Sequence, residues 1–581
     1  MGMSGLRKIH VASLLAVLSG CTAEVSTDAS QGPGTAGPGI ANGVVGVTPG
    51  LPGAAGATAA GAAGGAAPTT AGGAPGATGA NGMSCDSGRL EARAVMITPR
   101  QYVNVLRDLM GTTAVSDADA ATNSEFNFDT VDRPLMTTAM LDRLTRLAET
   151  ATATLKGKTP AALGCTAATD VACVRTGLQK LAHRAWKRPV EAAELDQIMA
   201  LHAMGMTAVP GDAGETGVMI ALQAVLTAPS ALYRTEFNAP VAAMQRVLTP
   251  HERASALAAL LLDSIPDDAL LAAADDGSLM NDAVMVQQID RLLLLPRVRE
   301  QITSTLLSSF NVPRVFTTPK DAKLFPDYTG MLQKSMFEET RRFVDDVLWT
   351  RNAPLGELLT SRRSFIDAPL AKLYGLPAPK TEFEATMMPP ERAGILTHAS
   401  VLTVLSRPDK TSVVARGLFI RGNVLCLSKI PGPPTSVAAQ VAAQLSATAT
   451  QKELAMYRAT TSPCMNCHSQ FDRFGLLLDG FDPIGRMTPA HAEPVDFTGL
   501  DPLNGVVNDV AGFTGIVEQN QMFEKCLSDR TFGYALSAAS DSTNFCLGNL
   551  RDPAKLKTAT IRDLIVAIAT SPAFNTRTGD L

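Results

Sequence analysis

The chain has 581 residues and a formal net charge of −5; 46% of its residues are hydrophobic and 18% are charged. The acidic balance argues against a nucleic-acid-binding protein, because such proteins present a basic surface to the phosphates. The apolar content excludes a wholly disordered chain, and the length predicts three or four domains. Leu and Ala dominate while aromatic residues make up only 5%, which predicts a mainly α-helical, multi-domain protein.

The first twenty residues have the layout of a secretory signal peptide. A basic start precedes an apolar stretch at residues 11–18, which is too short to span a bilayer. The residues that end it, Leu18-Ser19-Gly20-Cys21, resemble a bacterial lipobox, which implies cleavage before Cys21 and its lipidation. The residue after the cysteine is Thr22 and not Asp, which in Gram-negative lipoproteins favours transport to the outer membrane. We expect an exported protein that is lipid-anchored there, at the periplasmic face or the cell surface; the alternative is an ordinary signal peptide.

Residues 21–84 follow as a linker rich in Gly, Ala and Pro. Residues 31–80 contain no charged and no aromatic side chain, so this segment predicts a flexible tether that forms no core. The remainder predicts an N-terminal helical module, a second and a central helical module, a module with the cysteine motif described below, and a C-terminal helical module. Their expected bounds are 85–157, 158–240, 241–385, 386–494 and 495–581.

Three helix signals stand out. Thr98-Pro99 predicts a helix start and Gly111 its end. Thr249 opens a capping box with Pro in the first turn, ahead of a run rich in Ala and Leu. A third amphipathic segment spans residues 335–349.

Disulfides are expected in an exported protein. Two pairs are close enough in sequence to be partners: Cys165 with Cys173, and Cys526 with Cys546. Spacing does not prove connectivity, and this assignment leaves Cys85 and Cys426 over, either paired with each other or free.

One motif carries chemistry. Residues 464–468 read C-x-x-C-H, the attachment signature of c-type haem. Two thiols one turn apart can add to the two vinyl groups of one porphyrin, and the next residue can then ligate the iron. The sequence therefore predicts covalent haem c on Cys464 and Cys467, with His468 as the proximal iron ligand.

Other interpretations of the motif stay open. A redox disulfide normally occurs in a thioredoxin-like context, and a zinc site needs further ligands that the nearby sequence does not offer. Cys464 and Cys467 could also form a structural disulfide. A peroxidase-like enzyme with an open iron position is a further alternative, and no catalytic residue is identified.

The sixth iron ligand has several candidates: His398, Met487 and His491, with Met522 behind them. Met ligation would raise the reduction potential, but Met residues mostly fill cores. The acidic residues after the motif, Asp472, Asp479, Asp482 and Asp496, alternate with Gly and Pro, which predicts turn chemistry.

Several segments resemble a series of bacterial modules known as domains of unknown function 1587, 1595, 1592, 1588 and 1585, in that chain order. The segments are residues 97–109 for the first, 184–189 for the second, 228–236, 265–271 and 370–375 for the third, 394–398, 416–417, 464–468 and 481–486 for the fourth, and 526–574 for the last. The chain departs from the usual pattern at Leu478-Asp479-Gly480 and at Leu248-Thr249, outside the haem motif.

The resemblance implies an exported, cytochrome-c-like protein, often encoded beside another secreted protein, and implies no substrate. The leading hypothesis is a haem lipoprotein for electron transfer or redox chemistry, with an unknown redox partner or secreted protein and no nucleic acid. The rival is a haem-free structural or binding lipoprotein in which Cys464 and Cys467 form a disulfide.

Overall fold

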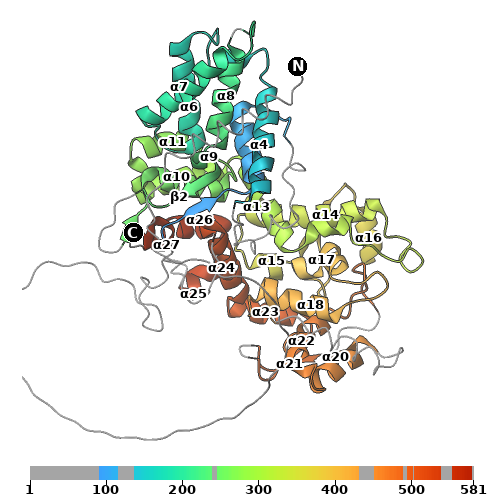
Figure 1. Cartoon of the computed structure of the whole chain (residues 1–581). Helices are drawn as coiled ribbons and strands as arrows, with labels where there is room; N and C mark the ends of the chain where they lie inside the picture. The colour runs from blue at the N-terminus through green and yellow to red at the C-terminus, as the bar shows by residue number, and fades with distance from the viewer. Residues whose placement is uncertain are drawn as a thin grey trace, which may run out of the picture. The chain divides into compact units, whose positions relative to one another are not determined.

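The computed structural model describes residues 91–115, 136–212, 214–238, 245–428, 430, 450–488, 494–500, 503–537 and 552–578. The predicted signal peptide and linker, and the predictions at Cys21, His491 and Cys546, lie outside these residues. The described chain is mainly α-helical, as the composition predicts, with short two-stranded sheets between the helices (Figure 1). None of the described helices is long and apolar enough to cross a membrane.

The first helix begins and ends where the sequence predicts. Thr98 forms a capping box with Gln101, Pro99 occupies the first turn, and Gly111 ends the helix in a left-handed conformation at φ 61°. The elements up to residue 235 are β1 (Ala94–Met96), α2 (Pro99–Met110), α4 (Thr138–Ala153), α5 (Thr159–Ala162), α6 (Val171–Trp186), α7 (Ala192–Met206), α8 (Glu215–Thr227), α9 (Pro229–Leu232) and β2 (Tyr233–Thr235).

Two glycines let α7 and α8 pack backbone to backbone. A Cβ atom on Gly205 would lie 2.5 Å from the Cα atom of Gly217, and one on Gly217 would lie 2.5 Å from the His202 carbonyl oxygen. Any side chain at either position would push the helices apart.

The central helices also follow their sequence signals. Thr249 and Glu252 form the predicted capping box of α10, and the predicted segment 335–349 lies in α14 and its π-helical continuation η4. The elements are β3 (Gln245–Val247), α10 (Pro250–Leu261), α11 (Asp268–Asp275), η2 (Ser278–Met280), α12 (Asp282–Leu293), α13 (Pro296–Ser309), η3 (Val312–Phe316), α14 (Gly330–Asp345), η4 (Asp346–Thr350), α15 (Glu357–Thr360), β4 (Arg363–Ile366), α16 (Ala368–Tyr374) and β5 (Glu384–Met387).

The last part of the chain contains shorter helices. They are η5 (Ile395–Thr397), α17 (Ala399–Val404), α18 (Val413–Phe419), the π-helix η6 (Ile420–Val424), α20 (Gln451–Thr460), α21 (Met465–His468), α22 (Asp472–Leu476), α23 (Val510–Gln519), α24 (Met522–Leu536), α25 (Pro553–Lys557), α26 (Ile561–Ala569) and α27 (Pro572–Asn575), with strands β6 (Val495–Asp496), β7 (Val506–Val507) and β8 (Thr576–Thr578).

One hydrophobic core runs from residue 254 to residue 574. It takes side chains from α10, α14, α17, α22, α24 and α26, while two smaller clusters bury the helices of residues 102–232. This core crosses the predicted boundaries at 385 and 494, so the central segment, the cysteine-motif segment and the C-terminal segment pack together. The module limits themselves stay a prediction.

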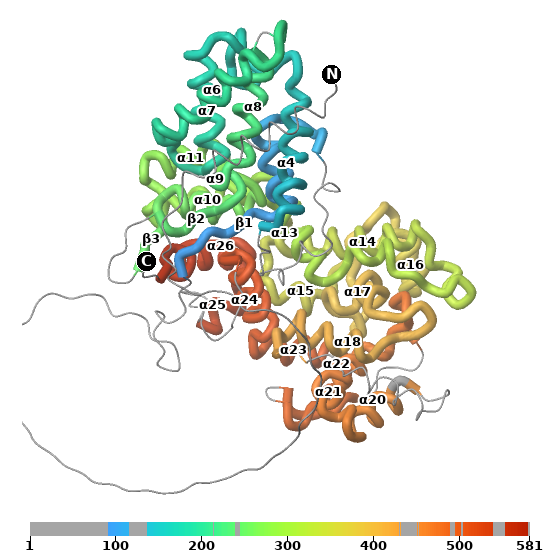
Figure 2. The backbone as a smooth tube through the Cα atoms, viewed as in Figure 1, coloured from blue at the N-terminus to red at the C-terminus, as the bar shows by residue number. Residues whose placement is uncertain are grey.

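Strand pairing brings distant parts of the chain together. β3 pairs with β8 in antiparallel register, with Arg246 opposite Arg577, and β1 pairs with β2, with Val95 opposite Arg234 (Figure 2). Beneath these strands the Glu236 carboxylate accepts two hydrogen bonds from Arg577, at 2.7 and 2.8 Å, and both side chains are 1% exposed.

Two more arginines approach the same carboxylate. Arg93 lies 3.3 Å and Arg234 3.7 Å from its oxygens. Burial opposes ionisation of Glu236, but the Arg577 hydrogen bonds and the charges of the three arginines outweigh it and lower the Glu236 pKa below its ordinary value.

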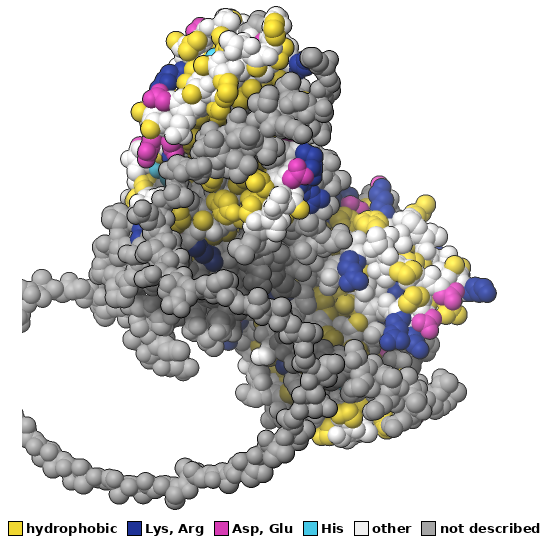
Figure 3. All heavy atoms as spheres, viewed as in Figure 1, with side chains coloured by type: hydrophobic (Ala, Val, Ile, Leu, Met, Phe, Trp, Pro, Cys, Tyr) yellow, Lys and Arg dark blue, Asp and Glu magenta, His cyan; other side chains and the backbone are white. Residues whose placement is uncertain are grey.

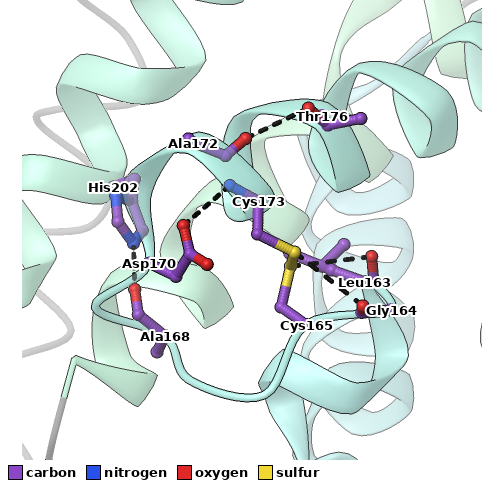
Figure 4. Close-up of a disulfide and its surroundings, with 9 residues drawn as sticks. All are labelled: Leu163, Gly164, Cys165, Ala168, Asp170, Ala172, Cys173, Thr176 and His202. Carbon is purple, nitrogen blue, oxygen red and sulfur yellow. Dashed lines mark hydrogen bonds between the residues drawn. A yellow bond between two sulfur atoms is a disulfide. The ribbon is translucent and has the colours of Figure 1, made fainter.

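The structure contains the expected disulfide between Cys165 and Cys173, which closes the loop before α6 (Figure 4). Asp170 caps that helix by accepting a hydrogen bond from the Cys173 amide, and His202 of α7 lies 3.2 Å from the Ala168 carbonyl oxygen. The short loop is therefore tied to both α6 and α7.

The second expected pairing is wrong. Cys526 bonds to Cys426, 100 residues away, and not to Cys546. Cys426 follows η6 and Cys526 lies in α24, and these two elements pack against each other. Sequence proximity suggested the wrong partner for Cys526, because the fold packs η6, and Cys426 after it, against α24. The disulfide joins the predicted haem-motif and C-terminal modules.

We expect Glu236→Gln to destabilise the protein by roughly 3–5 kcal/mol, because Arg577 would stay buried without its anionic partner. The lowered Glu236 pKa means that ionised Glu236 contributes its full stability above the unfolded glutamate pKa of about 4.3. This contribution is lost as the pH falls through the folded pKa, so the variant should lack that part of the acid sensitivity. Urea unfolding at pH 7 and between pH 5 and 3 measures both effects.

The matched control is Asp142→Asn. Asp142 pairs with Arg146 on the surface, with side chains 61% and 62% exposed, and its loss should change stability by less than about 0.5 kcal/mol. Equal stability of Glu236→Gln and the wild type would show that the buried cluster does not hold the strands together.

Candidate functional site

The C-x-x-C-H motif forms a single tight turn. Cys464 is the N-cap of α21, and its carbonyl oxygen accepts from the amides of Cys467 at 3.2 Å and His468 at 3.0 Å. Cys464 is buried, Cys467 is half-buried, and both are free thiols. The disulfide that the rival interpretation requires is therefore not formed. The turn presents two thiols and an imidazole within five residues.

A buried carboxylate holds the imidazole of the motif. The His468 Nδ1 atom lies 3.1 Å from Asp472 Oδ2, and the Asp472 side chain is 1% exposed. A carboxylate can only accept, so in the neutral imidazole the Nδ1 atom carries the proton and the Nε2 atom keeps its lone pair. The Phe471 ring packs 4.9 Å from the imidazole, centroid to centroid, and helps to fix its orientation.

Arg458 completes this arrangement from α20. Its Nε atom donates to the same Asp472 Oδ2 atom at 3.0 Å, and its side chain is 12% exposed. The Asp472 Oδ1 atom and the Arg458 Nη2 atom are buried without a hydrogen-bond partner. Buried polar atoms without a hydrogen-bond partner are uncommon in folded proteins, and these two lie next to the motif.

Two glycines position Asp472. A Cβ atom on Gly475 would clash with the Val413 carbonyl oxygen, and one on Gly417 would clash with the Phe471 carbonyl oxygen. The backbones of α22 and α18 therefore touch, which places the start of α22 and its Asp472 under the imidazole. A substitution at either glycine would displace this support.

Beyond Arg458 lies a cationic pocket of about 120 Å³. Its lining includes Arg407, Lys410 and Arg458 together with the Thr411 and Ser412 hydroxyls. Arg407 and Lys410 are exposed, so the pocket is open to solvent. Its charge and its hydroxyl groups suit a carboxylate or another anion.

The acidic residues after the motif divide into two roles. Asp482 accepts from the amides of Ile484 and Arg486, and Asp496 accepts from the Thr498 amide, so the turn prediction holds for both. Burial raises the pKa of Asp479 against the Arg416 charge and a Thr411 hydrogen bond.

Asp472 does not follow the turn prediction, because it lies in α22 and binds His468. The four-residue spacing between the two could have indicated this contact, although they belong to two separate short helices, α21 and α22. Arg458 had no such signal, because it lies 14 residues from Asp472 in the chain.

The structure places His398 in a separate polar network. His398 is wholly buried, its Nδ1 atom lies 3.1 Å from the Thr340 hydroxyl and its Nε2 atom 3.5 Å from the Ser364 hydroxyl. Burial and the Arg392 charge lower the His398 pKa to about 3. Its two nitrogens therefore face hydroxyl groups in the core, and no described hydrogen bond or ring contact joins it to the motif.

Glu339 stands at the centre of that network. Its carboxylate accepts from Tyr374 at 2.5 Å and from Ser364 at 2.9 Å, and Arg392 lies 4.0 Å over the Tyr374 ring. Burial raises the Glu339 pKa to about 7, against the hydrogen bonds from Tyr374 and Ser364 and the Arg392 charge. No spacing or motif in the sequence indicated this cluster, which joins α14, β4 and α16 in the core.

Of the other candidates for the sixth ligand, His491 lies outside the described residues. Met487 and Met522 are partly buried against the main core. The sixth ligand stays a prediction.

Three family models match the chain. They are described as proteins of unknown function: DUF1595, or PSD5, over residues 173–236, DUF1592, or PSD4, over 248–376, and DUF1588, or PSCyt3, over 392–491. No curated protein and no solved structure matches the chain. The PSCyt3 span contains the whole motif together with Arg458 and Asp472. The outer modules, 1587 and 1585, stay predictions. The chain belongs to the family of multi-module proteins that carry domains of unknown function 1595, 1592 and 1588 in this order.

Proposed function

We propose that the chain is an exported c-type haem protein that acts in electron transfer or redox chemistry. Cys464 and Cys467 would attach the porphyrin, and His468 would ligate its iron through Nε2. The observation that carries the proposal is the hydrogen bond from His468 Nδ1 to Asp472, next to two free thiols. Iron-ligating imidazoles commonly donate their other ring N–H to a carboxylate or carbonyl in this way.

The surroundings of the motif fit a haem group. The orphaned Asp472 and Arg458 atoms offer unused hydrogen-bonding capacity beside the motif, and the pocket with Arg407 and Lys410 offers cations for the two haem carboxylates. Bound haem would supply one-electron redox chemistry. The name PSCyt3 of the matched model also hints at cytochrome-like character.

The proposal includes a location and a partner. Lipidation at Cys21 would anchor the chain to the outer membrane, and the Gly/Ala/Pro linker would hold the folded part away from it. The body outside the haem segment is far larger than the roughly 100 residues of a small cytochrome domain. This supports docking to a redox partner or secreted protein over action as a bare electron carrier.

Haem attachment is tested by a pyridine haemochrome spectrum of protein exported in a host with cytochrome c maturation. We expect about one haem per chain that stays with the polypeptide after acid-acetone extraction, since thioether bonds resist it. The Cys464→Ala/Cys467→Ala variant should lose this absorbance. The matched control is Cys165→Ala/Cys173→Ala, which removes a pair of cysteines far from the motif and should keep the haem.

A colourless wild type from a host whose own c-type cytochromes are matured would contradict the proposal. The haem-free lipoprotein would then be the better interpretation, and mass spectrometry of the exported protein would show whether the two thiols have joined.

Asp472→Asn should raise the reduction potential of the haem protein. The anionic carboxylate stabilises the more positive ferric state, and asparagine lacks that charge. A loss of roughly 1.5 kcal/mol, the low end for one hydrogen bond to a charged group, corresponds to a rise of about 65 mV for a one-electron couple. Spectroelectrochemical titration measures the potential, and the haemochrome spectrum confirms equal haem content.

Asp496→Asn serves as the control, because Asp496 caps a turn and does not bind His468. It should leave the potential within about 10 mV of the wild-type value, since an exposed charge is strongly screened. An unchanged or lower potential in Asp472→Asn would mean that this carboxylate does not act on the iron through His468.

A further inference from the structure

Three side chains far from the haem motif converge on one point. His183 comes from α6, His251 from the first turn of α10, and Asp275 ends α11. The Asp275 Oδ1 atom lies 3.0 Å from His183 Nε2 and 2.9 Å from His251 Nε2. One ligand atom from each of the three residues lies within 4.8 Å of the others.

Only one of these two close approaches to Asp275 is a hydrogen bond. His251 Nε2 meets Asp275 Oδ1 with hydrogen-bond geometry, whereas the buried His183 Nε2 atom has no hydrogen-bond partner despite its 3.0 Å approach to the same oxygen. Two imidazole nitrogens thus point at one carboxylate oxygen, and one of them is unsatisfied. A cation between the three atoms would accept all three lone pairs.

The atom types and spacings match a metal site. Two imidazole nitrogens and one carboxylate oxygen are a common ligand set for zinc and other first-row divalent metals. Bonds of about 2.0–2.1 Å in a tetrahedral centre place ligand atoms about 3.3 Å apart. The two distances to Asp275 are slightly shorter than this, so small side-chain rotations would admit an ion.

The supporting elements are rigid and the local charge is favourable. α10 and α11 pack against each other, and Asp275 stands in the last turn of α11, where the helix dipole favours a cation. The side chains of His183, His251 and Asp275 are 25%, 17% and 41% exposed. Figure 3 shows histidine and acidic side chains reaching the surface together at the left edge of the upper part. Water can therefore reach the remaining coordination positions.

We propose that His183, His251 and Asp275 bind one divalent first-row metal ion of the zinc class, with water completing its coordination. His183 lies in the span matched by the first family model, and the other two ligands lie in the span matched by the second. The ion would fasten α6 to α10 and α11 and so join two modules. This site is independent of the proposed haem.

Zinc binding to the full chain tests the proposal. The Cys464→Ser/Cys467→Ser background is used beside the wild type, because free thiols next to His468 could also take zinc. Calorimetric titration with zinc chloride should show one equivalent bound by the thiol-free background, and at least one by the wild type. Zinc should also raise the melting temperature, since it binds the folded state alone.

Ligand variants identify the site. Asp275→Asn and His251→Gln keep the side-chain size, and each should weaken zinc binding at least about tenfold and abolish the zinc-dependent rise in melting temperature. The control is Asp268→Asn, which removes an acidic residue that is 85% exposed and pairs with Arg184; it should bind zinc as the background does. Circular dichroism confirms that each variant is folded.

Two results would overturn the proposal. One is an unchanged zinc affinity in folded Asp275→Asn and His251→Gln, which would place the metal elsewhere. The other is no zinc uptake by the thiol-free background while Asp275→Asn lowers the melting temperature without zinc. The three residues would then form only an ion-pair network between the helices.

Discussion

The buried Glu236 carboxylate holds three distant segments of the chain in one place. Arg93 precedes β1, Arg234 lies in β2, and Arg577 lies in β8. An isolated buried carboxylate would be very costly, and so would three unpaired guanidinium groups, so each charge makes the burial of the others tolerable. Because β8 also pairs with β3, the same cluster fixes the position of α26 and α27 against the start of the central helices. The arrangement of the N-terminal and C-terminal helices around the main core depends on this one charge balance.

The cysteine motif depends on that core in a more local way. Its turn is partly exposed, but the residue that holds His468 is buried, and Asp472 reaches its position only because α22 and α18 touch at Gly475 and Gly417. The helix with Arg458 then adds a second contact to the same oxygen. A hydrogen-bonded turn thus presents the two thiols, while a buried carboxylate determines which nitrogen of the neutral imidazole stays available.

The sequence predicted what is local and missed what the tertiary fold creates. The capping boxes at Thr98 and Thr249 and the Cys165–Cys173 disulfide involve neighbours in the chain, and all three are confirmed. The Cys426–Cys526 disulfide spans 100 residues, and the helix and strand periodicities of a sequence do not predict contacts at such a separation. The cluster around Glu339 and the convergence of His183, His251 and Asp275 were missed for the same reason. Asp472 was the intermediate case: its spacing from His468 was visible, but its burial was not, and turn chemistry was the nearer explanation.

The pairing of β3 with β8 also determines the order in which this chain can fold. Residues 245–247 pair with residues 576–578, so this contact cannot form until more than 300 intervening residues are available to fold. Contacts of such sequence separation form late, because a long loop must close first. Helices α2 to α8 have partners nearby in the chain and can form their small cores early in folding. The cysteine motif emerges before the closing strand does. The chain therefore passes through a stage in which the two thiols are available while the strand pair that closes the fold around them has not yet formed.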